Sequence, residues 1–127
     1  MSEHSPSEFS DAWLSLGVVT AERLASQRVE WARGGQEDPR HFLWCAFVDF
    51  LRDRRPLSAE LAAALYDLGE RERDETLGES MMLRIVQLPE CPASVLDAAV
   101  ASGQRDLIRA VERRRADAAG RALDAAK

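Results

Sequence analysis

The sequence of 127 residues has only two cysteines, Cys45 and Cys91, too few for the disulfide framework of a small secreted domain. Its apolar runs are only a few residues long, far short of the roughly 20 residues that a membrane-spanning helix needs. The opening Met-Ser-Glu-His-Ser-Pro-Ser-Glu has neither the basic nor the apolar segment of a secretory signal peptide. We therefore expect a cytoplasmic protein with two free thiols and no membrane contact.

Signals for β-structure are almost absent as well. No window alternates β-branched and aromatic residues with a period of two, and no Asn-Gly or Asp-Gly hairpin turn occurs. The 7 glycines and 5 prolines instead separate segments whose apolar residues recur at helical spacing. A hydrophobic content of 46% is enough for a chain of this length to bury one core. The sequence predicts one all-α domain over residues 1–127, either a compact helical bundle or a short α-α stack.

Helix start and stop signals divide the chain into six or seven short helices. Thr20, Asp38 and Ser58 are predicted N-caps, because a side-chain oxygen there can accept a hydrogen bond from an otherwise unpaired backbone N–H. Gly17 is predicted to end the first helix, although a single helix through Gly17 also fits the pattern. The expected helices cover about residues 7–16, 20–33, 39–54, 58–68, 77–87, 92–101 and the segment that begins near 104.

The segment 39–54 is expected to be the centre of the core. Its apolar residues cover most of the helix circumference, which is typical of a helix packed on more than one side. By contrast, Gly69 and the charged residues 70–75 are expected to form a helix end or a loop.

The two ends of the chain are expected to pack poorly. After Val111 the apolar positions of the last helix are taken by Arg114 and Arg115, so the apolar stripe breaks. Residues 116–127 are therefore expected to form a frayed or solvent-exposed helix, and residues 1–6 are expected to be mobile.

Residues 88–114 show a proline-started helix with a Val-Leu pair, a glycine turn and a second short helix. The residues that carry this pattern are Pro92, Val95, Leu96, Ala99, Gly103, Leu107 and Val111. The segment resembles one unit of the HEAT-like or leucine-rich-variant α-helical repeats. The resemblance covers 27 of the 127 residues, with no clear second copy, although 39–68 could be a diverged one. It implies a HEAT-like right-handed α-α stack that offers an interaction surface and not a reaction.

Charge is distributed unevenly along the chain. Residues 65–103 carry 8 acidic and 3 basic side chains, whereas residues 104–127 carry 4 acidic and 7 basic ones. This division argues against a dedicated nucleic-acid binder, and no aromatic residue after Tyr66 is available to stack on bases. Of the 17 basic residues 16 are arginines, which together with the abundant alanine indicates a GC-rich bacterial genome.

Two sets of side chains are candidates for contacts with a partner. Arg109, Arg113 and Arg114 could bind an acidic protein partner or, as a third reading of the sequence, nucleic acid through weak phosphate contacts. Trp31, beside an Arg-Gly-Gly turn, is the best single candidate for an exposed aromatic contact.

His41, Cys45 and Asp49 form the sharpest polar pattern, because their four-residue spacing places them on one helical face. A His and a Cys one turn apart could chelate zinc, but a structural zinc site needs four ligands, and Cys91 is the only other cysteine. A metal- or thiol-dependent protein built on His41, Cys45 and Cys91 is therefore the alternative hypothesis. The leading expectation is that the chain holds no metal and no cofactor.

Each candidate catalytic motif lacks a residue or loop that its chemistry requires. A Cys45–His41 pair would need an orienting third group and an oxyanion hole, and Asp49 is two turns from His41. There is no Gly-x-Ser-x-Gly motif and no phosphate-binding loop, and the acidic residues of 70–79 do not have the spacing of a calcium loop. The sequence thus predicts a non-enzymatic bacterial protein-interaction module, an adaptor or regulatory subunit. Its partner is unidentified and could be a second copy of the chain.

Overall fold

The computed structural model describes residues 6–35, 38–72 and 74–126, and the side chains of these residues only between 11 and 120. The described residues form seven α-helices and no strand, which confirms the all-α prediction. The helices are α1 (Pro6–Leu16), α2 (Ala21–Ala32), α3 (Pro39–Arg54), α4 (Ala59–Arg71), α5 (Glu75–Gln87), α6 (Ala93–Ala101) and α7 (Arg105–Ala126). The expectation that residues 1–6 are mobile concerns residues that, except for Pro6, lie outside the described part of the chain. No helix found among the described residues is long and apolar enough to span a bilayer.

The helix boundaries follow the local signals in the sequence. Thr20, Asp38 and Ser58 are N-caps as predicted, and their side-chain oxygens accept backbone N–H groups at 3.1, 2.8 and 3.1 Å. Gly17 has a φ of 79°, a left-handed conformation that glycine adopts without strain, so α1 and α2 are separate helices.

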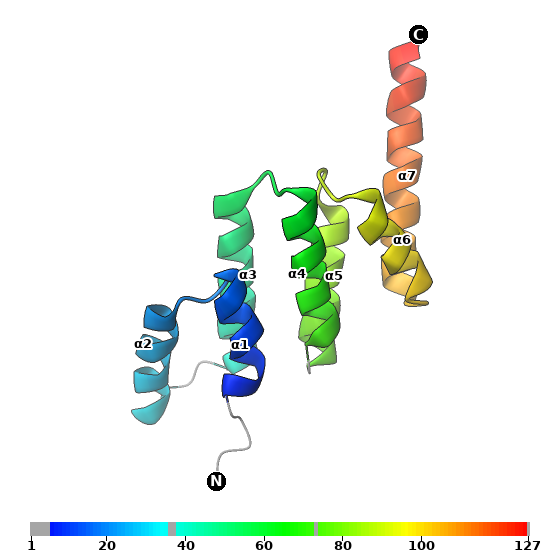
Figure 1. Cartoon of the computed structure of the whole chain (residues 1–127). Helices are drawn as coiled ribbons and strands as arrows, with labels where there is room; N and C mark the ends of the chain where they lie inside the picture. The colour runs from blue at the N-terminus through cyan, green and yellow to red at the C-terminus, as the bar shows by residue number, and fades with distance from the viewer. Residues whose placement is uncertain (1–5, 36–37, 73, 127) are drawn as a thin grey trace.

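The helices pack in two layers (Figure 1). In one layer α5 lies between α3 and α7, and in the other α4 contacts α6. Across the layers α4 pairs with α5 and α6 pairs with α7, each pair running in opposite directions. The described part of the chain is therefore an α-α stack, and its buried apolar residues form one core.

The amino-terminal helices pack on α3 through aromatic side chains. Trp13 of α1 meets Phe47 edge-on with ring centroids 6.5 Å apart, and Trp31 of α2 meets Phe42 edge-on at 5.8 Å. Trp13 and Phe47 are almost fully buried. Because edge-to-face aromatic pairs keep their helices apart by the width of a ring, these helices lie further from α3 than α4 lies from α5.

The centre of the stack is α5, and the expectation that residues 39–54 occupy it is wrong. The backbone of α5 approaches α3, α4, α6 and α7, whereas α3 approaches α5 and receives α1 and α2 through its aromatic side chains. The buried residues of α5 spread over two sides of the helix. They are Leu77, Gly78, Met81, Met82, Ile85 and Val86.

A contact between two glycines joins α4 to α5. Gly69 and Gly78 are both buried, and a Cβ atom on Gly78 would lie 2.5 Å from the carbonyl oxygen of Gly69. A Cβ on Gly69 would lie 3.1 Å from both the Gly78 oxygen and Met81. Residues 69–75 are the end of α4 and the connection to α5, as expected, because α4 ends at Arg71 and α5 begins at Glu75. Gly69 itself is still helical, and its missing side chain permits the close packing of α4 on α5.

Substitution of the two helical glycines Gly78 and Gly120 by alanine should have opposite effects. Gly78→Ala gains helix propensity but forces α4 and α5 apart, so we expect a net loss of about 1–3 kcal/mol of unfolding free energy. Gly120→Ala has nothing within 4 Å of the new Cβ and should be neutral or stabilising by up to about 1 kcal/mol. Urea unfolding followed by circular dichroism measures both; equal stability of the two variants would contradict the packing role of Gly78.

Two arginines fix the loop between α5 and α6. Arg55 binds both carboxylate oxygens of Glu90, at 3.0 and 3.1 Å, and Glu90 also accepts the backbone N–H of Leu57 at 3.1 Å. Arg114 of α7 donates to the carbonyl oxygens of Leu88 and Pro89. The break in the apolar stripe at Arg114 therefore has a structural use: this half-buried arginine satisfies carbonyl groups at the end of α5 and holds α7 beside it.

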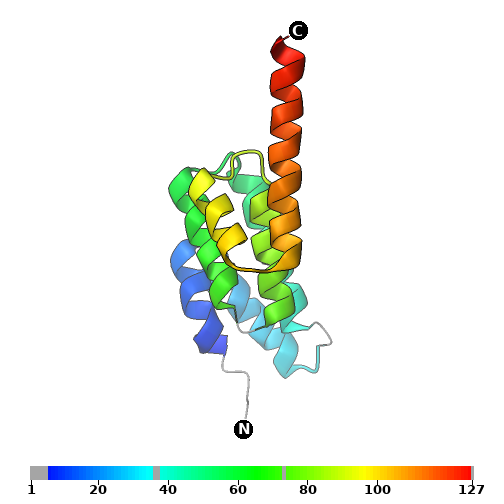
Figure 2. The ribbon, with the colours of Figure 1, turned by 90° about the vertical axis from the view of Figure 1, so that its right-hand side faces the viewer.

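The remainder of α7 extends beyond the stack (Figure 2). From 112 to 120 every side chain is exposed except that of Arg114, which confirms the expected solvent-exposed helix over the described side chains. Arg115, the second residue at the break in the stripe, pairs with Asp97 of α6 at 3.1 Å.

The Arg55–Glu90 contact should make stability depend on pH in the acid range. The hydrogen bonds from Arg55 lower the pKa of Glu90 from its ordinary value of 4.5 to about 2. The stabilisation is therefore complete above about pH 5 and is lost as the pH falls toward 2. Melting temperatures of the wild type and Glu90→Gln, measured across this range, should differ at neutral pH and converge in acid. A constant difference would show that the Glu90 charge has no role.

Candidate interaction surface

The pattern of His41, Cys45 and Asp49 remains on one face of α3, but its members have different partners. Cys45 Sγ lies 3.5 Å from His41 Nε2, so these two residues are in contact as their spacing predicts. The Asp49 carboxylate lies 3.5 Å from Arg23 and 3.2 Å from Arg52 instead. Within the described residues no three His, Cys, Asp or Glu side chains are grouped so that they could hold a metal ion.

Cys91 is separated from this pair in the fold and differs from Cys45 in its surroundings. It lies in the loop between α5 and α6, is buried, and its Sγ approaches the Pro92 carbonyl oxygen at 3.8 Å. Burial raises the pKa of the Cys91 thiol to about 11. Cys45 is only partly buried. Both are free thiols, as expected.

The two thiols should therefore react at different rates. A chromogenic disulfide reagent at neutral pH should modify one thiol of the folded protein quickly, and Cys45→Ser should remove that fast phase. The Cys91 thiol should react only after denaturation, since it is buried and protonated. Fast modification of both thiols in the folded chain would contradict this assignment.

Trp31 and Trp44 are both half-buried, so the structure does not present Trp31 as a fully exposed aromatic residue, and its role as a partner contact stays a prediction. Trp31 is half-buried, because its ring packs edge-on against Phe42. Trp44, also half-buried, stacks on Phe47 at 5.8 Å, and the Arg84 guanidinium lies over its ring at 5.5 Å. Trp44 also lines a groove of about 320 Å³ between α3 and α5. Sequence spacing alone could not separate these two tryptophans, because both lie on helices with several apolar faces.

A second groove, of about 380 Å³, lies between α5 and α7. Leu83 and Ala110 are its half-buried apolar residues, and Arg109 and Arg113 are exposed beside them. Neither of these two arginines forms an ion pair with any part of the chain that is described. Arg114 also lines the groove, but its guanidinium is bound to the α5–α6 loop, so its role as a partner contact stays a prediction.

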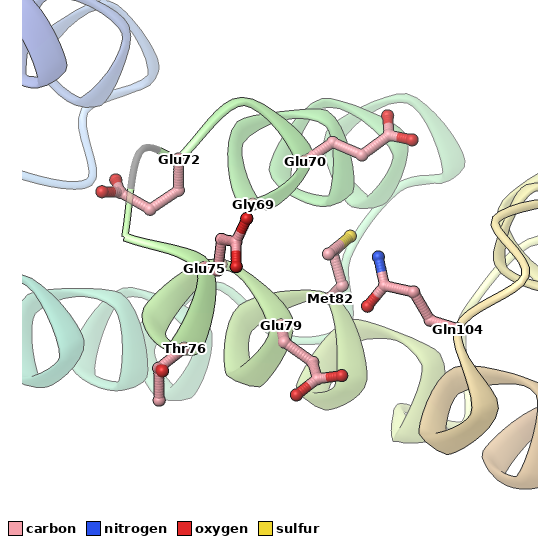
Figure 3. A pocket seen from close by; sticks show the side chains of 9 residues that line it. Gly69, Glu70, Glu72, Glu75, Thr76, Glu79, Met82 and Gln104 are labelled. Atoms are coloured by element: carbon pink, nitrogen blue, oxygen red, sulfur yellow. The ribbon is translucent and has the colours of Figure 1, made fainter.

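An acidic recess of about 590 Å³ lies between α4 and α5, with Gln104 at one side of it (Figure 3). Its acidic residues come from the end of α4 and the start of α5: they are Glu70, Glu72, Glu75 and Glu79. None of the four forms an ion pair within the described residues. Met82 and Gln104 close the recess on the side where α7 begins. The helical hairpin of α4 and α5 gathers these acidic residues at one place.

The acidic recess and the α5/α7 groove belong to one continuous surface. Glu79, Leu83 and Gln87 follow at four-residue intervals on α5, and so lie along one helical face. Arg109 and Arg113 have the same spacing on α7. We call this surface, from Glu75 and Glu79 through Leu83 to Arg109 and Arg113, the α5/α7 face. Its arrangement is suited to recognition by charge and apolar contact.

Compared with known protein families, with curated proteins and with solved structures, the chain matches none of them. The resemblance of residues 88–114 to HEAT-like repeats therefore stays a prediction. Any assignment of function has to come from the geometry of the surface.

Proposed function

We propose that this chain is a non-catalytic protein-interaction module, an adaptor or regulatory subunit, that binds an acidic segment of a protein partner on the α5/α7 face. The observation that carries the proposal is the pair Arg109 and Arg113, exposed and without an ion pair in the described chain, beside the apolar residues Leu83 and Ala110. Arginine is enriched at protein interfaces because its guanidinium binds carboxylates with two parallel hydrogen bonds while its stem packs on apolar atoms.

The attachment of α7 supports this use of the surface. The bonds from Arg114 to Leu88 and Pro89 hold α7 beside α5, so the groove is formed before a partner arrives. A preformed groove costs less conformational entropy on binding than a mobile one. Exposed arginines beside the groove also raise the association rate of an acidic partner.

A protein partner is favoured over nucleic acid by the composition of the groove. Asp106 and Asp117 line the groove together with Arg109 and Arg113, so the continuous charge of a phosphate backbone along α7 would be repelled by the aspartates, whereas an acidic protein segment can place its carboxylates at the two arginines alone. The sequence also has no aromatic residue after Tyr66, hence α7 offers no ring for a base to stack on.

The test is a pull-down with the tagged chain from its source cells, repeated with the double variant R109E/R113E. We expect the captured protein to be lost with this variant and to be released from the wild type by salt, because the contacts are between exposed charges. The matched control R28E/R33E makes the same change of charge on α2, away from the groove. Equal capture by both variants would contradict the proposal, and circular dichroism checks that each is folded.

A further inference from the structure

The α5/α7 face changes sign along its length. Glu75 and Glu79 lie in the first half of α5, at the acidic recess. Leu83 and Gln87 follow further along α5 and line the groove with Arg109 and Arg113. Since α5 and α7 run in the same direction (Figures 1 and 2), the acidic end and the basic end are displaced along the helix axes.

This displacement arises from the offset of the last hairpin. The turn between α6 and α7 lies above the lower ends of α4 and α5, so that α7 leaves the start of α5 uncovered (Figures 1 and 2). Gln104, just before α7, borders the acidic recess, while Arg114 reaches the end of α5. Arg109 and Arg113 are therefore level with the second half of α5, whereas Arg105, the first residue of α7, lies nearer to the recess but forms no ion pair with Glu75 or Glu79 in the described chain.

A face that is acidic at one end and basic at the other is complementary to a copy of itself turned by 180°. Glu75 and Glu79 are separated by one helical turn, and so are Arg109 and Arg113, which gives both pairs a spacing of about 6 Å. In an antiparallel arrangement each glutamate pair of one copy faces the arginine pair of the other. Such an interface is isologous and closed, because the same two-fold axis forms both sets of contacts.

We propose that a second copy of this chain covers the α5/α7 face in a two-fold symmetric antiparallel dimer. Glu75 and Glu79 of each protomer pair with Arg109 and Arg113 of its partner, and Leu83 lies near the axis. The inference rests on the proposed function: the acidic segment that the groove binds is here the Glu75–Glu79 segment of the second copy. A second copy is favoured because Glu75 and Glu79 on the one hand, and Arg109 and Arg113 on the other, are unpaired within the described residues and have the same spacing; Asp106 and Asp117, which line the groove beside the arginines, take no part in these contacts.

Sedimentation equilibrium and light scattering of the purified full chain test this arrangement. We expect a dimer at about 50 mM salt that dissociates at about 500 mM, because the exposed charges are screened. E75R/E79R and R109E/R113E should each raise the dimer dissociation constant by about tenfold or more, since each places like charges opposite one another. The control R28E/R33E should remain as dimeric as the wild type.

Mixing the two double variants gives the decisive result. E75R/E79R carries only arginines at these four positions and R109E/R113E carries only glutamates, so each repels itself but complements the other. An equimolar mixture should form a heterodimer, detected with one variant tagged. Circular dichroism checks that each variant is folded. If E75R/E79R is not folded, because the start of α5 does not tolerate two arginines, the single variant E79R takes its place. A mixture that stays monomeric overturns the antiparallel arrangement.

The outcomes separate this inference from the proposed function. A wild-type chain that is monomeric at all salt concentrations, yet captures another protein that R109E/R113E loses, overturns the second copy and keeps the interaction module. A dimer that neither double variant weakens shows that the copies meet elsewhere, and overturns the inference. If in addition capture by R109E/R113E equals that by the wild type, the proposed function fails as well.

Discussion

The contact of Gly69 with Gly78 is the constraint on which the rest of the structure depends. It brings the backbones of α4 and α5 closer than any side chain would permit, because a Cβ at Gly78 would overlap a carbonyl oxygen. With α4 so close on one side, α5 can bury its other apolar residues against α3, α6 and α7. Although α5 contacts four other helices, it keeps Glu75, Thr76, Arg84 and Gln87 exposed, and Glu79 and Leu83 are half-buried on the side that faces the groove and the recess.

The position of α7 is fixed by apolar and polar contacts together. Leu107 and Val111 are fully buried, but the next residue on that side is Arg114, whose guanidinium binds carbonyl oxygens at the end of α5. The arginine both continues the attachment and ends the apolar contact, so that α7 leaves the stack after this point (Figure 2). Glu90, held by Arg55, fixes the same loop from the side of α3. Charge-assisted hydrogen bonds, which are more directional than apolar contacts, thus hold the last hairpin in its offset position together with the buried Leu107 and Val111.

The offset has an electrostatic consequence. If α7 began level with α5, Arg109 and Arg113 would lie beside the acidic start of α5 and the charges would cancel within one chain. Because α7 starts higher, the two signs remain apart on one surface. The uneven charge of the sequence thereby becomes a spatial pattern, in which the four glutamates and the two arginines form no ion pairs among the described residues. Both proposals rest on this separation of charge.

The sequence by itself determined the all-α class, the N-caps at Thr20, Asp38 and Ser58, and the contact of His41 with Cys45. These features depend on residues at most four positions apart, and their physics is complete within one turn of helix. Only the tertiary structure decided that Gly69 packs against Gly78, that Trp44 borders a groove, and that Arg114 is bound within the chain. Each of these depends on an element distant in the sequence: α5 for Gly69, α5 again for Trp44, and the α5–α6 loop for Arg114. A linear pattern states which residues can pack or pair, but the partner that each receives is set by where the other helices lie.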